Sequence, residues 1–128
     1  MPKNEIDRMF RAFSDRSRLR ILYLIKDGEM CVGDIVQILG LPQPTASRHL
    51  AYLRRSGLVD VRKQGLWCLY SVAKSRGRFH QRLLDCLAFC FDEVPELAAD
   101  AAKAKQVMRD GGCCPLTGAK KCQPVIAG

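Results

Sequence analysis

The sequence predicts a mainly α-helical fold with one small β-hairpin, and three observations lead to this prediction. Apolar residues recur at helical spacing in two neighbouring segments, 31–39 and 44–56, which are separated by a short turn. The period then changes to two across residues 58–72, as expected for two strands joined by a tight turn. Two short helices followed by a hairpin make a winged helix-turn-helix, which is a DNA-binding unit.

Two further helices precede this unit. The first is predicted over residues 4–13 and the second over residues 16–26. Ser14 or Asp15 can cap the second helix, because short side chains with an oxygen acceptor satisfy the unpaired N–H groups of a first turn. The second helix carries three arginines on what we interpret as its solvated face, namely Arg16, Arg18 and Arg20.

The helix that begins near Pro44 is the predicted recognition helix. Its apolar residues Ala46, Leu50 and Leu53 are spaced i, i+4, i+7, so they share one face and leave the opposite face polar. Positive charge gathers on this helix and on the hairpin, at Arg48, Arg54, Arg55, Arg62 and Lys63. This placement of basic residues favours DNA as the partner.

The composition of the whole chain agrees with a small DNA-binding protein. Its 128 residues suit one modest core, and 21 Lys+Arg against 13 Asp+Glu give a net charge of +8. No run of about 18 apolar residues is present, so no membrane partner is predicted. The N-terminus lacks the apolar segment of a signal peptide, so we expect a cytoplasmic protein whose seven cysteines serve metal or redox chemistry rather than disulfides.

The C-terminal part divides into a helix, an Ala-rich segment and a tail. Residues 77–94 carry a wide apolar face, which in a small chain predicts coverage by a second copy and hence a homodimer. The segment after Pro95 has high helix propensity but little to bury, and an irregular tail follows from Gly111. We therefore predict a DNA-binding and dimerisation domain of order α-α-α-α-β-β-α at 1–94, and a C-terminal extension at 95–128.

Three stretches of the sequence carry a resemblance to a known family. They are FRAFSDRSRLRILYLI, EMCVGDI and LPQPTASRHLAYLRRSGLVDVRKQGLWCLYSV. Over roughly residues 5–93 the chain resembles the ArsR/SmtB family of metal- and metalloid-responsive repressors, and the run from Gln43 to Gly57 is the most specific part. The resemblance implies a homodimer joined by its first and last helices, which leaves its operator DNA when it binds an inducer.

The resemblance also implies which residues contact operator DNA. In the family's recognition-helix pattern QxxxSR, the residues that face base edges correspond here to Gln43, Thr45, Ser47 and Arg48, with His49 toward the flank. The residues expected to neutralise phosphates are Arg54, Arg62 and Lys63.

Four cysteines have a structural interpretation. Where the arsenic-responsive members of the family carry ELCVCDL, this chain has EMCVGDI, so Gly33 stands in place of one paired thiol. Cys31, which opens the first helix of the helix-turn-helix, is therefore interpreted as a small packing residue. Cys68 in the second strand is interpreted as buried, and Cys86 and Cys90, which share a helix face, as packing at the dimer interface.

Three cysteines in the tail, Cys113, Cys114 and Cys122, form the predicted inducer site. They lie in a stretch without apolar periodicity, so packing does not account for them. Trivalent arsenic or antimony takes three thiolate sulfurs, and the lysines between these cysteines favour the thiolate form. The predicted ligand is arsenite or antimonite acting as inducer, and no catalytic cofactor is expected. The paired CxxC spacing of a zinc site is absent.

Two alternatives on the same fold stay open, and an enzyme is a third class. A cadmium- or lead-type sensor would use Cys86 and Cys90 with a tail cysteine, whereas a redox switch would oxidise Cys113 and Cys114. The Asp and His ligands of the family's zinc and nickel sensors are reduced here to His80, which is interpreted as a surface or interface residue. The sequence shows no catalytic dyad, phosphate loop or cofactor motif, so no catalytic residue is predicted.

Overall fold

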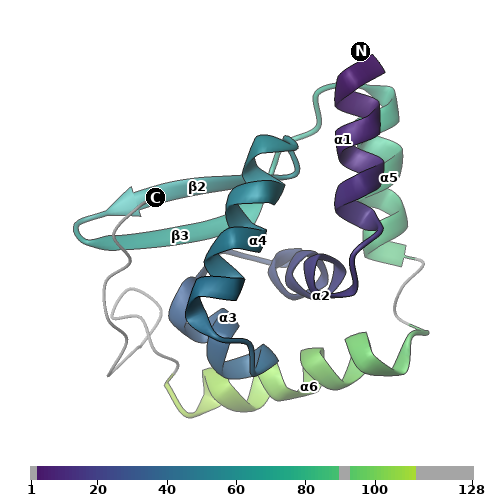
Figure 1. Ribbon diagram of the computed structural model, residues 1–128. Coiled ribbons are helices and arrows are strands. Elements are labelled where there is room, and N and C mark those ends of the chain that lie inside the picture. The colour runs from purple at the N-terminus through teal and green to yellow at the C-terminus, as the bar shows by residue number, and fades with distance from the viewer. Residues whose placement is uncertain (1–2, 90–92, 112–128) are drawn as a thin grey trace.

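The computed structural model describes residues 3–89 and 93–111, and over these ranges the chain forms six helices and three strands (Figure 1). The elements are α1 (Lys3–Phe13), α2 (Arg16–Ile25), β1 (Met30–Cys31), α3 (Val32–Leu39), α4 (Gln43–Arg55), β2 (Val59–Gln64), β3 (Trp67–Val72), α5 (Arg78–Phe89) and α6 (Pro95–Arg109). This order confirms the predicted winged helix-turn-helix, with α3 and α4 as its helices and β2 and β3 as its hairpin. None of the described helices is long and apolar enough to cross a membrane.

The three strands form one antiparallel sheet in the order β1-β3-β2. Strands β2 and β3 pair along their full length, and the hairpin turns at Gly65, whose positive φ of 62° suits a glycine. Strand β1 pairs Met30 with Tyr70 and Cys31 with Leu69. The sequence does not predict this strand, because two residues are too few to show a period. Cys31 therefore belongs to the sheet and precedes α3 instead of opening it.

The helix ends follow residues that the sequence marks. The Asp15 carboxylate caps α2 by accepting the Arg18 backbone N–H at 3.1 Å. Gly40 ends α3 in the left-handed region, with a φ of 70°. Gly57 follows α4 with a φ of 80°, and a Cβ at this position would lie 2.6 Å from the Arg76 guanidinium. A larger residue at position 57 would therefore be strained in its backbone, and the flexible end of the Arg76 side chain would have to move aside.

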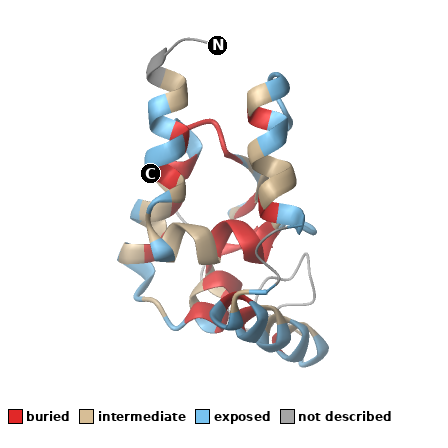
Figure 2. Cartoon of the chain, turned by 90° about the vertical axis from the view of Figure 1, so that its right-hand side faces the viewer, coloured by how far each residue is buried: buried red, intermediate tan, exposed pale blue. Residues whose placement is uncertain are grey.

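The core lies where α2, α3, α4 and the sheet meet. Figure 2 shows that the buried residues gather in the interior and that the outward helix faces are exposed. Residues with no exposed surface in this core include Ile21, Leu22, Ile35, Leu50 and Leu53. Removing these side chains from water fixes the rotation of each helix about its own axis. The rotation of α4 in turn decides which of its residues point away from the protein.

Helix α6 belongs to this helical body. It packs against α2 and α3 (Figure 1), and it buries Leu97 and Val107, which are 1% and 7% exposed. The expectation that the Ala-rich segment has little to bury is therefore wrong. These two residues are nearly three helical turns apart, so they give no recognisable apolar stripe among the alanines.

Candidate nucleic-acid interface

Helix α4 carries most of the residues predicted to contact DNA. Ala46, Leu50 and Leu53 are each 0% exposed, so the face that they share is fixed against the core. The residues predicted to contact DNA occupy the rest of the helix, where Gln43, Arg48 and Arg54 are exposed and Thr45, Ser47 and His49 are half-buried. The helix therefore presents a polar and basic surface outward, which is the property that a recognition helix needs.

The hairpin carries the other two predicted residues, Arg62 and Lys63, both exposed on β2. Arg62 donates from Nε and Nη2 to the two carboxylate oxygens of Glu29, at 2.9 Å each, and from Nη1 to Gln64 at 2.7 Å. The hydrogen bonds from Arg62 hold the pKa of Glu29 below its ordinary value. The predicted phosphate contact of Arg62 therefore has to compete with a carboxylate of the protein itself.

Arg18 on α2 contacts the Tyr52 side chain of α4. Its guanidinium carbon lies 4.2 Å from the centroid of the Tyr52 ring, and its N–H groups donate to Ala12 O at 3.2 Å and Arg11 O at 2.8 Å. The interpretation of Arg18 as a solvated residue is wrong, because neutral partners hold its side chain in place. Sequence reasoning missed this contact because the two residues come from different helices.

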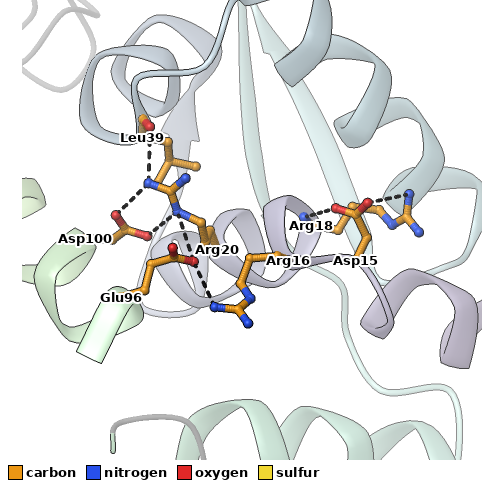
Figure 3. Close-up of polar contacts among 7 residues, drawn as sticks. All are labelled: Asp15, Arg16, Arg18, Arg20, Leu39, Glu96 and Asp100. Atoms are coloured by element: carbon orange, nitrogen blue, oxygen red, sulfur yellow. Dashed lines mark hydrogen bonds and ion pairs between the residues drawn. The ribbon is translucent and has the colours of Figure 1, made fainter. Parts of the chain in front are cut away.

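Asp15 lies beside Arg18 at the start of α2 (Figure 3). Its Oδ2 atom is 4.0 Å from Nη1 of Arg18. Burial raises the pKa of Asp15, but the Arg18 backbone N–H and the positive charges of Arg18 and His49 lower it more, and its net pKa is below the ordinary value. The carboxylate is thus charged at neutral pH and stabilises the N-terminus of α2.

Arg20 connects α6 to the helix-turn-helix (Figure 3). It donates from Nε and Nη2 to the two oxygens of Asp100 at 2.8 and 3.0 Å, and from Nη2 to Leu39 O at 3.2 Å. Glu96 lies 3.9 Å from Arg20 and 3.6 Å from Arg16. Arg20 is therefore a structural residue that bridges α6 and the last turn of α3, and the interpretation of it as solvated is wrong.

His80 on α5 is buried, with 0% of its surface exposed, so its interpretation as a surface residue is wrong. Its Nδ1 atom accepts the Arg76 backbone N–H at 3.1 Å, and its Nε2 atom has no hydrogen-bond partner among the described residues. Burial, and then the positive charge of Arg76, lower the pKa of His80, whereas Asp60 and Glu5 act in the opposite direction. The neutral imidazole is the form that this environment favours.

Some of the cysteines are among the described residues and others lie outside them. Cys31 and Cys68 are buried, as interpreted from the sequence, and Cys86 is half-buried on α5. The described residues contain no group of three or more His, Cys, Asp and Glu side chains that could hold a metal ion. Cys90 and the predicted ligands Cys113, Cys114 and Cys122 lie outside the described residues.

The chain is similar to several transcriptional regulators. It is 42% identical over 78 residues to an uncharacterized HTH-type transcriptional regulator of Methanocaldococcus jannaschii, covering 60% of this chain and 88% of that protein. It is 40% identical over 78 residues to the arsenical resistance operon repressor of Escherichia coli, with 60% and 67% covered. To the arsenic resistance transcriptional regulator ArsR2 of Pseudomonas putida it is 32% identical over 111 residues, with 83% and 95% covered.

Solved structures agree with these relatives. HlyU from Vibrio cholerae superposes with a TM-score of 0.59 at 32% identity, covering 70% of this chain and 99% of that one. A homodimeric winged helix-turn-helix DNA-binding domain from Mycobacterium bovis gives the same TM-score and identity, with 70% and 81% covered. Residues 15–61, from the cap of α2 into β2, match the family described as bacterial regulatory protein, arsR family. With its winged-helix fold and these relatives, the chain belongs to the arsR family of DNA-binding transcriptional regulators.

Proposed function

We propose that this chain is a homodimeric repressor that binds operator DNA and releases it when the tail binds arsenite or antimonite. One observation carries the proposal. Helix α6 is tied through Asp100 and Arg20 to Leu39 at the end of α3. It ends at Arg109, two residues before Gly111, where the tail with the three cysteines begins. A change that begins in the tail thus has a short physical route to the helix-turn-helix.

Helices α1 and α5 are the proposed dimer interface. Phe10 on α1 and Phe89 on α5 are 53% and 76% exposed, and coverage by a partner would remove both rings from water. The Phe10 ring also packs edge-on against Phe79 of α5, with 5.4 Å between the ring centroids. The two helices therefore lie in contact and each exposes a phenylalanine, which a second copy of the chain can cover by two-fold symmetry.

In this proposal, DNA is read by α4 and held by the hairpin. Gln43, Thr45, Ser47 and Arg48, with His49 at the flank, face the base edges in the major groove. The phosphates are contacted by Arg54, Arg62 and Lys63. The support is the outward orientation of these residues, since the buried face of α4 leaves them on the accessible side of the helix.

Cys113, Cys114 and Cys122 would hold the inducer. Three thiolates are the donor set that trivalent arsenic and antimony prefer, and the inducer would supply a centre able to bind all three sulfurs at once. Two of the similar proteins are a repressor of an arsenical resistance operon and a regulator of arsenic resistance. Their similarity supports a thiophilic metalloid as the inducer of this chain.

The coupling would pass through Arg20. Leu39 is the last residue of α3 and is separated from α4 only by the turn at 40–42. A displacement of α6 that disturbs the Arg20–Asp100 pair therefore also disturbs the hydrogen bond that Arg20 makes with Leu39 O. A coupling free energy of about 1–3 kcal/mol would reduce operator affinity by a factor of about 5 to 150.

The test is operator binding followed by fluorescence anisotropy under reducing conditions. Arsenite, antimonite, methylarsenite, cadmium and zinc are titrated into the DNA complex of the wild type and of a Cys113→Ser/Cys114→Ser/Cys122→Ser variant. A Cys86→Ser variant serves as the matched control, because it removes a thiol outside the tail. We expect trivalent metalloids to release the wild type and the control, while the triple variant stays bound.

Other outcomes would select an alternative. Release of the triple variant by arsenite would show that the tail is not the inducer site. Loss of induction by cadmium in the Cys86→Ser variant would indicate a divalent-metal sensor that uses α5. Release of the wild type by peroxide, without any metalloid, would indicate a thiol redox switch.

A further inference from the structure

Five arginines and a tyrosine line a groove on the side of α4 that faces α1 and α2. One hollow of the surface is lined in part by Arg18, Arg48, Tyr52 and Arg55, and a second by Arg8, Arg11, Tyr52 and Arg55. Tyr52 and Arg55 line both hollows, so the two hollows adjoin each other and are taken together as one groove. We call it the arginine groove, and its members are Arg8, Arg11, Arg18, Arg48, Arg55 and Tyr52.

The arginine groove carries positive charge that the protein itself does not neutralise. Among the described residues, Arg8, Arg11, Arg48 and Arg55 make no ion pair with a carboxylate, and Arg18 has only the 4.0 Å contact with Asp15. Arg20 and Arg62, by contrast, are each paired with a carboxylate, in Arg20–Asp100 and Arg62–Glu29. Five neighbouring arginines with a single carboxylate contact within 4.0 Å among the described residues create a positive surface, which is suited to a polyanion.

Tyr52 gives the groove a fixed shape. The guanidinium carbon of Arg18 lies 4.2 Å from the centroid of its ring, and that of Arg55 lies 6.0 Å from it. Arg18 is also held by two backbone carbonyl oxygens in the last turn of α1. These contacts use neutral groups, so they position the cations without cancelling their charge. A phosphate that enters the groove therefore meets the Arg18 and Arg55 guanidinium groups already held beside Tyr52.

The position of the groove identifies DNA as the polyanion. Arg48 belongs both to the groove and to the face of α4 that is predicted to contact bases, and it lies 3.5 Å from the hydroxyl of Thr45. Helix α4 lies between the hairpin on one side and α1 on the other (Figure 1). DNA with α4 in its major groove thus has one backbone near the hairpin and the other near the arginine groove.

We propose that the arginine groove binds the sugar–phosphate backbone of DNA on the α1 side of the recognition helix. The inference rests on the proposed DNA-binding function and extends it to residues outside α4 and the hairpin. If α1 and α5 form the dimer interface, the grooves of the two protomers face the centre of the complex. The phosphates that they contact then lie between the two half-sites, whereas the hairpins contact phosphates at the outer ends.

The test measures how DNA affinity depends on salt. Neutralising one phosphate contributes about −0.9 to the slope of log Kobs against log salt concentration. An Arg8→Gln/Arg11→Gln variant that loses one contact in each protomer should reduce the steepness of the slope by about 2 and weaken binding about tenfold. The change in slope should be the same on operator DNA and on an unrelated duplex, because phosphate contacts carry no sequence information.

Two further variants separate this contact from a general effect. A Lys103→Gln/Arg109→Gln variant removes the same amount of charge from exposed positions on α6, and we expect its salt slope to match the wild type. An Arg8→Lys/Arg11→Lys variant keeps the charge and should restore most of the slope. Ethylation interference on the wild-type complex then locates the contacted phosphates without any substitution.

Each result decides the inference. Equal slopes for the wild type and the Arg8→Gln/Arg11→Gln variant would overturn it while leaving the proposed function intact. If that variant fails to dimerise in sedimentation, the interference map decides, and a map without contacts between the half-sites overturns the inference. A wild type that binds no duplex would overturn the proposed function and this inference together.

Discussion

Arg18 and Arg20 are two residues apart on α2, yet their guanidinium groups have opposite surroundings. Arg20 meets Asp100 through two hydrogen bonds of 2.8 and 3.0 Å, so its charge is matched inside the protein. Arg18 is held by the Tyr52 ring and by carbonyl oxygens, and its nearest carboxylate is 4.0 Å away. An arginine matched by a carboxylate fixes the fold, whereas one held by neutral groups keeps its charge available for a ligand.

The two sides of α2 therefore make different kinds of contact. On the Arg20 side, the helix is tied to α6 and through it to the proposed inducer site. On the Arg18 side, it forms a wall of the arginine groove beside the recognition helix. A single helix thus separates the regulatory contacts from the DNA-facing contacts, and substitutions on its two sides should affect different measurements.

The largest effect is expected from Asp100→Ala, which breaks the matched pair. The side chains of Arg20 and Asp100 are only 20% and 8% exposed, so the substitution leaves a mostly buried cation without its partner. We expect the free energy of unfolding to fall by about 2–3 kcal/mol in urea denaturation. In the anisotropy assay, arsenite should also release less DNA from this variant, because α6 is no longer tied to α3.

Glu96→Gln is the matched control for this prediction. Glu96 is on the same helix and 3.9 Å from Arg20, but its side chain is 42% exposed. Solvent screens such a contact, so the stability should change by less than about 0.5 kcal/mol. If both variants lost the same stability, the effect would come from α6 as a whole and not from the bidentate pair.

An intermediate effect is expected from Arg18→Gln, on the other side of α2. Loss of the contact with Tyr52 and of the bonds to Ala12 O and Arg11 O should lower the free energy of unfolding by about 1–2 kcal/mol. DNA affinity should fall as well, but trivalent metalloids should still release the variant from the DNA that it binds. A variant with wild-type DNA affinity would exclude Arg18 from the groove's function.

The pH dependence of stability tests the buried His80. The pKa of His80 in the folded chain is lowered from 6.5. Once the pH falls below about 6.5, the imidazole is therefore protonated in the unfolded chain but stays neutral in the folded one. Stability should therefore decrease from pH 7.5 to pH 5.5, by at most about 1.4 kcal/mol per pH unit for one proton. Urea denaturation of the wild type and of His80→Gln measures this, and the variant should show a shallower dependence.

Local features of the fold could be predicted from the sequence, and long-range ones could not. The buried face of α4, the hairpin and the stop at Gly40 follow from periodicity and backbone preference within a few residues. The Arg20–Asp100 pair joins residues 80 positions apart, and no local pattern marks either partner. His80 has no distinctive neighbours in sequence, and its burial depends on how α5 meets the rest of the protein.

The same distinction applies to the candidate site. Residue type and helical phase were enough to predict which face of α4 is polar, because the opposite face is apolar. They did not reveal that Tyr52 is covered by Arg18, nor that Arg62 is paired with Glu29, since these partners come from other elements. The roles of the predicted contact residues and of the tail cysteines stay predictions until the binding assays are made.

The smallest effect is expected from Glu29→Gln, which converts a matched arginine into an unmatched one. Arg62 and Glu29 are both exposed, so the stability should not change measurably. The substitution removes the carboxylate that competes with phosphate for the Arg62 guanidinium, and DNA affinity should rise by about two- to threefold in the anisotropy assay. Arg62→Gln should lower the affinity, and in its presence Glu29→Gln should have no further effect. If Glu29→Gln weakened DNA binding instead, the carboxylate would be holding Arg62 in its DNA-binding position. An arginine paired with a carboxylate could then also bind DNA, and the difference between Arg18 and Arg20 would not extend to the hairpin.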